Sequence, residues 1–356
     1  MRRLIRPTGF VDSPFGHDGK VARLAGGMSW FSAVELLAVE RGRRVSAELL
    51  PVEGIEKRFD DDLAAQWRAL TVPRAPLELG PRTVRLDQPQ VMAIVNVTPD
   101  SFSDGGRFAD SASAAEAAAD MAGQGAAILD VGGESTRPGA SPVWAGDEIE
   151  RAVPVIERLA AAGAAVSVDT RKADVMAAAL GAGAHMVNDV SALTFDPRSV
   201  ETVATAGVPV VLMHHQGSPE TMQQDPRYED VLIEVYEWLE QRIAAAEAAG
   251  IARDRILVDP GFGFGKTVAH NLDLLNGLAL FHSLGCPIVL GASRKRTIGA
   301  LANEAPVDRR LGGSIALALK AVEQGAQIVR VHDVPETVQA LRVWRGLRDQ
   351  ALTPRV

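Results

Sequence analysis

The chain has 356 residues, 47% of them hydrophobic, and a formal net charge of −8. This size suits one large domain plus an extension, and the acidic balance without a basic block argues against nonspecific nucleic-acid binding. The single cysteine, Cys286, excludes an intrachain disulfide and a multi-thiolate metal site. No segment approaches the roughly 18 apolar residues of a membrane span, and the N-terminus lacks the apolar stretch of a signal peptide. We therefore expect a soluble cytoplasmic protein.

Residues 1–75 show no regular alternation of strands and helices. Their composition is mixed, and the pattern predicts only one helix, over residues 60–70, capped by Asp60, Asp61 or Asp62. The proline-rich residues 72–76 predict a linker or an extended arm. We assign residues 1–75 to an N-terminal extension of unknown role and residues 76–350 to the main domain.

Two β-prone runs, residues 77–79 and 83–86, flank Gly80 and Pro81 and predict a small hairpin. Eight short β-branched runs then alternate with helical stretches; they span residues 91–95, 127–129, 165–168, 185–187, 208–213, 256–258, 287–290 and 327–331. Eight βα units in about 250 residues match the size of a TIM barrel. We predict an α/β protein, a TIM (β/α)8 barrel with an N-terminal extension, in which the hairpin plugs the bottom of the barrel.

Polar side chains stand at or just past the end of each predicted strand. They are Asn96, Asp130, Asp169, Asn188, Asp189, His214, Asp259, Ser293, Lys295, Arg330 and His332. Active sites of such barrels lie at the rim formed by the C-terminal ends of the strands. These residues are therefore the first candidates for chemistry.

The loops after the first two predicted strands carry oxygen donors and a cation. Asn96 and Asp104 offer hard oxygen ligands suited to Mg²⁺, although a connector rich in polar turns has a similar composition. In the second loop, Gly132 and Gly133 allow close approach of a ligand to the backbone, and Arg137 offers a bidentate donor for phosphate or carboxylate. The alternative for Arg137 is a solvated surface arginine.

Three further strand ends carry Asp169, Asn188 and Asp259. A carboxylate in an apolar barrel mouth needs hydrogen-bond donors, and the edge of an aminopyrimidinone ring supplies two side by side. The alternative is that these residues cap the following helices. That alternative suits Asp169, but it suits Asp259 poorly because a glycine-rich run follows.

The glycine-rich run over residues 260–267 is not a P-loop, because Pro260 occupies the position of the required first glycine. Phe262 or Phe264 offers a ring face to a planar ligand, with core packing as the alternative. The basic loop 293–296 and the pair Arg330 and His332 follow the last two strands, where such barrels commonly bind phosphate. His214 and His215 are adjacent and lack the spacing of a zinc site.

Together these motifs resemble the dihydropteroate synthase family of pterin-binding barrels. The matching segments are NVTPDSFSDGG, LDVGGESTRPGA, SVDTRK, NDVSAL, LMHHQGSPETMQ, DPGFGFGK, GASRK and RVHDV, in the family's order between Val91 and about Leu341. The resemblance implies condensation of 6-hydroxymethyl-7,8-dihydropterin diphosphate with p-aminobenzoate, giving 7,8-dihydropteroate and diphosphate. This is the folate-synthesis step that sulfonamides block.

The resemblance also implies a role for each matched residue. Pterin contacts would come from Asp169, Asn188, Met213, Asp259, Phe264 and Lys295. The diphosphate would be bound by Asn96, Arg137, Arg330 and His332, with Mg²⁺ on Asn96 and Asp104. Phe102, Ser135, Thr136 and Pro138 would close over p-aminobenzoate. The catalytic set would be Asp104, Arg137, Lys295, Arg330 and His332.

Two residues depart from the family's common pattern. His215 stands where many members carry methionine, and Arg296 stands where a serine often binds the aminobenzoate carboxylate; arginine could bind the same group as an ion pair. Two other functions stay open, a pterin-dependent corrinoid methyltransferase of the same barrel class and a noncatalytic pterin-binding protein. The second loop and the pair Arg330 and His332, which suit a diphosphate, argue against the methyltransferase. The presence of all the residues of the first two loops argues against a noncatalytic protein. The family suggests a homodimer through barrel helices away from the rim.

Overall fold

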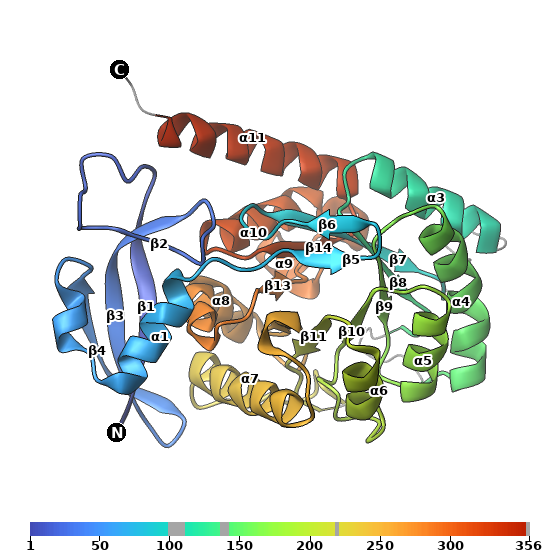
Figure 1. Ribbon diagram of the computed structural model, residues 1–356, viewed down its shortest axis with the longest axis horizontal. Coiled ribbons are helices and arrows are strands. Elements are labelled where there is room, and N and C mark those ends of the chain that lie inside the picture. Colours follow the sequence, from blue (N-terminus) through green and yellow to red (C-terminus); the bar gives the residue numbers. More distant parts are fainter. Residues whose placement is uncertain (99–110, 136–141, 218–220, 354–356) are drawn as a thin grey trace.

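A closed parallel barrel forms the centre of the molecule (Figure 1). The computed structural model describes residues 1–98, 111–135, 142–217 and 221–353. Its eight-stranded sheet has the order β12-β11-β10-β9-β8-β7-β14-β13. A parallel bridge between Val258 and Ile288 joins the two outer strands, so the sheet closes on itself. The predicted TIM barrel is confirmed.

The barrel strands overlap the eight predicted runs. They are β7 (Gln90–Asn96), β8 (Ile128–Gly132), β9 (Val166–Asp169), β10 (Met186–Asp189), β11 (Val210–Met213), β12 (Ile256–Asp259), β13 (Val289–Leu290) and β14 (Ile328–Val331). Parallel strands covered on both faces are apolar at almost every position. That burial explains why continuous β-branched runs marked them so clearly.

Helices cover the outside of the barrel (Figure 1). They are α3 (Ser111–Gly123), α4 (Ala145–Ala161), α5 (Ala173–Gly181), α6 (Ser199–Ala206), α7 (Val231–Ala248), α8 (Val268–Asn276), α9 (Arg296–Leu301), α10 (Leu311–Glu323) and α11 (Val334–Leu352). Short 3-10 turns are η2 (Arg253–Arg255), η3 (Leu278–Leu284) and η4 (Val307–Arg309). In α4, Ala152, Val155, Ile156 and Leu159 are buried toward the sheet, the spacing of a helix with one apolar face. No helix of the described segments is long and apolar enough to cross a membrane.

The hairpin before the first barrel strand consists of β5 (Leu77–Leu79) and β6 (Arg82–Val84). Its apolar side chains cluster with those at the starts of the barrel strands: Leu77, Leu79, Val84 and Leu86 with Met92, Ile128, Met186, Val211, Leu257, Val289 and Ile328. Gly80 turns the hairpin with a φ of 61°, a conformation that favours glycine. The predicted plug of the barrel bottom is confirmed.

The N-terminal extension contains an antiparallel sheet that the sequence did not predict. Its strands are β1 (Arg2–Val11), β2 (Ala22–Arg23), β3 (Trp30–Glu40) and β4 (Arg43–Pro51), followed by η1 (Ile55–Arg58) and α1 (Asp61–Thr71). The predicted helix is confirmed, and Asp60 caps it by accepting from the Leu63 amide at 3.0 Å. In β1 neighbouring side chains are buried on both faces, so a clean period of two is missing there, whereas β4 is exposed at almost every position. Ile5 faces α1 with Leu63, whereas Leu4 joins the barrel core.

The extension lies against one side of the barrel, near α7 and α8 in Figure 1. Arg2 Nη1 donates to Oε2 of Glu240 on α7 at 2.8 Å. The amide of Arg44 donates to Oδ2 of Asp230, the N-cap of α7, at 3.2 Å. Leu37 and Val39 of β3 belong to the same apolar cluster as the barrel strands. The extension therefore joins the barrel core through a few side chains, while most of its buried residues form a cluster of their own.

Candidate active site

A charged network crosses the C-terminal mouth of the barrel. Arg330 at the end of β14 donates from Nε to Oδ2 of Asp130 at 2.6 Å, and from Nη2 to Oδ2 of Asp169 at 2.6 Å. Asn188 of β10 donates to the same Asp130 oxygen at 2.9 Å. Three strands thus meet at one guanidinium group, and a fourth joins the network through Asp130. Asp130 was a strand-end candidate without an assigned role, and the structure places it at the centre of this network.

The two carboxylates of this network each keep a free acceptor. Within the described residues, Oδ1 of Asp130 and Oδ1 of Asp169 are buried and accept no hydrogen bond. A buried acceptor without a donor is costly, so a ligand with adjacent N–H groups would be stabilised here. Burial raises the pKa of Asp169 to about 7, with Arg330 opposing the rise and Asp130 adding to it.

Asp259 lies at the end of β12, and its side chain is not a helix cap. Its Oδ1 accepts from the Gly261 amide at 2.7 Å, whereas Thr267 caps the following helix, α8. The cap alternative also fails for Asp169, because the residue at the N-cap of α5 is Lys172. Burial raises the pKa of Asp259, opposed by the nearby Lys295 and the Gly261 amide. The carboxylate is buried at the rim with one oxygen fixed by the backbone.

The glycine loop, defined here as Gly261–Gly265, is held at every carbonyl. Side chains donate to each of the five oxygens: Lys266 to Gly261 and Phe264, Lys295 to Phe262, Gln223 to Gly263, and Tyr228 to Gly265. Its three glycines have φ values of 70°, 83° and 63°, in the region that favours glycine. The loop is therefore fixed by its surroundings.

The two phenylalanines of the glycine loop have different environments. Phe262 is fully buried in the main core, so core packing explains it. Phe264 is half-buried, and the Lys295 ammonium lies 4.3 Å from its ring centroid, a cation–π distance. Met213, at the end of β11, is 5% exposed. Of the two rings, Phe264 is the one that remains accessible to a planar ligand.

The basic loop after β13 places its three cations differently. Burial lowers the pKa of Lys295 to about 7, opposed by the nearby Asp259 carboxylate. Arg294 is paired with Asp333, its Nε lying 3.0 Å from Oδ2, so it is not free to bind an anion. Arg296 is exposed at the start of α9. Only Lys295 of the three lies beside the carboxylates.

His332 and the histidines after β11 also have defined partners. Nδ1 of His332 lies 3.0 Å from Oγ of Ser293, which joins the ends of β13 and β14. His215 contacts the Gly217 carbonyl at 2.9 Å through Nδ1, a local structural role. Within the described ranges, no three His, Cys, Asp or Glu side chains are grouped to hold a metal ion.

The first two rim loops are only partly described. Phe102, Asp104, Thr136, Arg137 and Pro138 lie outside the described residues. Asn96 ends β7 and is half-buried, and Ser135 follows the second loop's glycines.

The backbone at Gly133 lies close to another part of the protein, the residue Glu148 on α4. A Cβ there would lie 2.9 Å from the Glu148 carbonyl oxygen. Glu134 in the same loop binds Arg171 at 3.0 Å and Lys172 at 3.0 Å. These contacts fasten the base of the second loop to the loop after β9.

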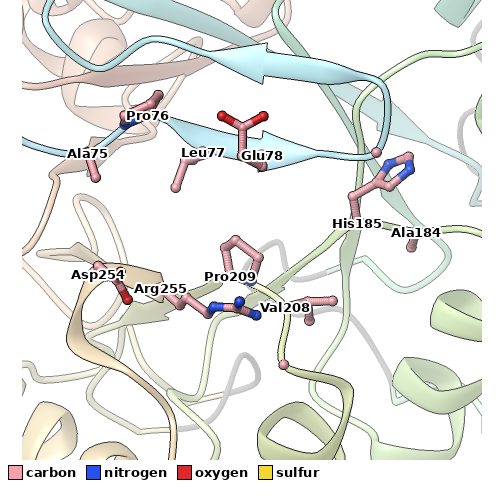
Figure 2. A pocket seen from close by; sticks show the side chains of 12 residues that line it. Ala75, Pro76, Leu77, Glu78, Ala184, His185, Val208, Pro209, Asp254 and Arg255 are labelled. Atoms are coloured by element: carbon pink, nitrogen blue, oxygen red, sulfur yellow. The ribbon is translucent and has the colours of Figure 1, made fainter.

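A separate cavity of about 340 Å³ opens at the other end of the barrel, beside the hairpin (Figure 2). Its lining includes Leu77, His185, Pro209 and Arg255. None of the predicted site residues lines it. This cavity is therefore distinct from the rim network, and the chemistry-bearing residues point to the rim.

Comparison with known proteins agrees with this arrangement. Residues 92–332 match the model of the family described as pterin binding enzyme. The chain is 50% identical over 259 residues to a dihydropteroate synthase of Escherichia coli K12, covering 72% of this chain and 91% of the relative. A Neisseria meningitidis serogroup B dihydropteroate synthase is 48% identical over 270 residues, covering 74% and 94%.

Solved structures show the same likeness. A Xanthomonas albilineans dihydropteroate synthase with 4-aminobenzoic acid has a TM-score of 0.73 at 48% identity, covering 79% of this chain and 100% of that one. A Yersinia pestis enzyme in a sulfonamide drug complex has a TM-score of 0.74 at 46% identity, covering 77% and 99%.

The fold and the rim thus define a pterin-binding barrel enzyme. More narrowly, the chain belongs to the dihydropteroate synthase family. Its substrates are small molecules, and its reaction is that of a transferase.

Proposed function

We propose that the rim of this barrel joins 6-hydroxymethyl-7,8-dihydropterin diphosphate to p-aminobenzoate, with the residues below in the stated roles. The observation that carries the assignment is the meeting of Asp130, Asp169, Asn188 and Asp259 at one mouth, where Oδ1 of Asp130 and Oδ1 of Asp169 are buried and accept no hydrogen bond within the described residues. A pterin ring offers N–H and NH₂ donors on one edge. Charge-assisted hydrogen bonds of this kind are stronger than neutral ones.

In this proposal Asp259 anchors the pterin through its ring N–H and 2-amino group. Asp169 and Asn188 bind the remaining polar edge, and Lys295 donates to the carbonyl side. Met213 and Phe264 lie on the two faces of the ring. The support is their common position at the ends of β9, β10, β11 and β12 and in the loops beyond.

The diphosphate is assigned to Asn96, Arg137, Arg330 and His332. The structure constrains how Arg330 can take part, because its Nε and Nη2 already bind carboxylates. Nη1 remains for the ligand, since a guanidinium has five N–H groups. Arg330 therefore serves two purposes in this scheme: it balances Asp130 and Asp169 and presents one arm to an anion.

Mg²⁺ is assigned to Asn96 and Asp104, which fit it by chemistry, since both offer hard oxygen ligands. Asn96 supports the assignment by its place, because it ends β7 at the rim and is half-buried. When bound, the ion would offset negative charge on the diphosphate. The protein's own cations would share that task.

The chemistry is substitution at the pterin methylene carbon. Its bond to the diphosphate oxygen breaks, and the electron pair leaves with diphosphate. The neutral aniline nitrogen then forms a bond to the carbon and loses one proton to solvent. Catalysis consists of stabilising the leaving group and orienting the nucleophile. Phe102, Ser135, Thr136 and Pro138 are proposed to close over p-aminobenzoate on binding.

Three further assignments belong to the same proposal. We place the protein in the cytoplasm, expect a homodimer through barrel helices away from the rim, and divide the chain into an extension of residues 1–75 and a barrel of residues 76–350. The dimer is what the resemblance to the family implies. The reach of the family match, residues 92–332, supports the division.

The experiment is an assay of purified protein with dihydropterin diphosphate, p-aminobenzoate and Mg²⁺. We expect diphosphate release with dihydropteroate formation, and its loss when a chelator removes the ion. Turnover that is indifferent to chelator would remove Mg²⁺ from the scheme. A corrinoid methyltransferase would instead require methyltetrahydrofolate and cobalamin, and would release no diphosphate.

A further inference from the structure

Lys266 is a buried lysine directly behind the glycine loop, and the proposed chemistry gives it no task. Its side chain is 2% exposed. Nζ lies 3.0 Å from the Gly261 carbonyl oxygen, 3.0 Å from that of Phe264, and 2.9 Å from Nδ1 of His214. Three partners at hydrogen-bond distance satisfy every position of a terminal amine.

The protonation state does not change this satisfaction. Burial lowers the pKa of Lys266 well below its usual value, opposed by Asp259, and burial also lowers that of His214. As an ammonium, Lys266 donates to both carbonyls and to His214. As a neutral amine it donates to both carbonyls and accepts from the other histidine tautomer. The two carbonyls are held in either state.

Those two carbonyls belong to the residue that binds Asp259 and the residue that carries the half-buried ring. Gly261 is held by Lys266 at its carbonyl, while its amide fixes Oδ1 of Asp259 at 2.7 Å. Phe264, held at its own carbonyl, carries the ring beside the Lys295 ammonium. Lys266 therefore connects to the carboxylate through the backbone of Gly261, and it holds the backbone of Phe264, the residue that carries the ring.

The glycine loop also packs closely against the neighbouring backbone. At Gly261 an added Cβ would lie 1.7 Å from the His214 carbonyl oxygen, and at Gly265 it would lie 2.3 Å from that of Gln216. The backbone of the loop lies against the segment that follows β11, and its five carbonyls accept from side chains. Buried carbonyls need donors, and Lys266 supplies two of the five.

We propose that Lys266 is a positioning residue for the pterin, which sets the orientation of the Asp259 carboxylate and the Phe264 ring by binding the Gly261 and Phe264 carbonyls of the glycine loop. This inference rests on the proposed function, because it takes Asp259 and Phe264 as the pterin contacts. Lys266 itself does not touch the substrate. Its loss should therefore change pterin recognition and leave p-aminobenzoate recognition in place.

The test replaces the amine and keeps the apolar stem, with Lys266→Met. Lys320→Met is the matched control, because Lys320 is a half-buried lysine on α10, away from the loop. We expect Lys266→Met to weaken binding of 6-hydroxymethyl-7,8-dihydropterin by at least about tenfold in calorimetry, and to raise KM for the diphosphate substrate. KM for p-aminobenzoate should stay within about twofold, and the control should match the wild type in both.

Folding is measured beside binding, with all titrations done well below the melting temperature of each variant. If Lys266→Met does not fold, Lys266→Gln takes its place as the test. Glutamine keeps an amide donor, so we expect it to weaken pterin binding by a smaller factor. A folded variant of either kind with a lowered melting temperature and unchanged pterin affinity would overturn the inference.

Asp259→Asn is titrated in the same series to separate this inference from the proposed function. Weakened binding in Asp259→Asn with normal binding in Lys266→Met rejects only the positioning role. Normal binding in both rejects the pterin anchor and the inference together.

Discussion

Arg330 donates from Nη2 to Oδ2 of Asp169 across 2.6 Å, and this contact joins the ends of β14 and β9 across the barrel mouth. The same guanidinium binds Asp130, so one cation lies between two buried carboxylates. Removing one partner of a buried ion pair leaves an uncompensated charge. The charge state of this network should therefore affect the free energy of unfolding as well as ligand binding. The pH dependence of stability measures it.

Asp169→Asn should change how stability depends on pH. The folded protein holds the Asp169 proton to about pH 7, whereas the unfolded chain releases it near the ordinary value of 3.8. Between these values the folded state binds more protons, so this group makes the wild type less stable as pH rises from about 4 to about 7. The free energy of unfolding, wild type minus variant, should fall by at least about 1 kcal/mol from pH 5 to pH 8.

Urea denaturation at the two pH values measures this difference. Asp254→Asn, at an exposed position in η2, is the control and should show no such trend. A difference that is constant with pH would mean that Arg330 keeps Asp169 ionised throughout.

The ionisation of Lys295 should make kcat/KM for the pterin substrate depend on pH. Its pKa is lowered to about 7 by burial, so the ammonium becomes a neutral amine as pH rises through that value. If the charged form binds the pterin, kcat/KM for the diphosphate substrate should fall above about pH 7, approaching tenfold per pH unit. The arginine of Lys295→Arg stays charged throughout this pH range. The fall of kcat/KM above about pH 7 should therefore disappear in this variant, whatever its absolute rate. The same fall of kcat/KM with pH in the arginine variant would mean that another group titrates.

The barrel was predictable because its strands are buried on both faces. Runs such as residues 208–213 are apolar throughout, so a short β-branched segment was enough to mark each strand. The sheet of β1, β3 and β4 was not predicted. There, Leu4 faces the barrel and Ile5 faces α1, so the strand has no polar face to reveal a period of two.

The site was predictable as residue types at strand ends, but not as a set of pairings. Asn188 and Asp259 stand where parallel strands finish, and that position alone marked them. The contact of Arg330 with Asp130 and Asp169 joins residues 200 and 161 positions apart, and nothing local in the sequence signals it. In the sequence, Lys266 belongs only to a run that fails the P-loop pattern. Its partners are evident only in the folded structure, where the side chain is buried behind the glycine loop.

The extension should contribute to stability and not to the chemistry. Leu37 of β3 is 1% exposed within the barrel core, whereas Leu49 of β4 is 68% exposed. Leu37→Ala should lower the free energy of unfolding by about 2–5 kcal/mol through lost burial and a cavity, with both KM values unchanged. Leu49→Ala, the same change on an exposed strand of the same sheet, should be close to neutral. Altered KM values in a folded Leu37→Ala protein would show that the extension reaches the active site.

Deletion of residues 1–75 is a broader version of the same test. It would uncover η3, whose seven residues are all buried, and remove the contacts of Arg2 and Arg44 with α7. We expect low solubility but an intact rim in any protein that folds. A truncated protein that folds normally and has no activity would contradict this division of roles.

The central claim is that Asp259 anchors the pterin, and calorimetric titration of Asp259→Asn with a dihydropterin tests it most directly. The substitution keeps the size of the side chain, and its amide oxygen can still accept from Gly261. The new NH₂ group, however, faces a ligand donor, and a charge-assisted contact of about 1.5–3 kcal/mol is lost. The account predicts at least about tenfold weaker binding with little change in melting temperature. Unchanged affinity together with a lowered melting temperature would contradict it.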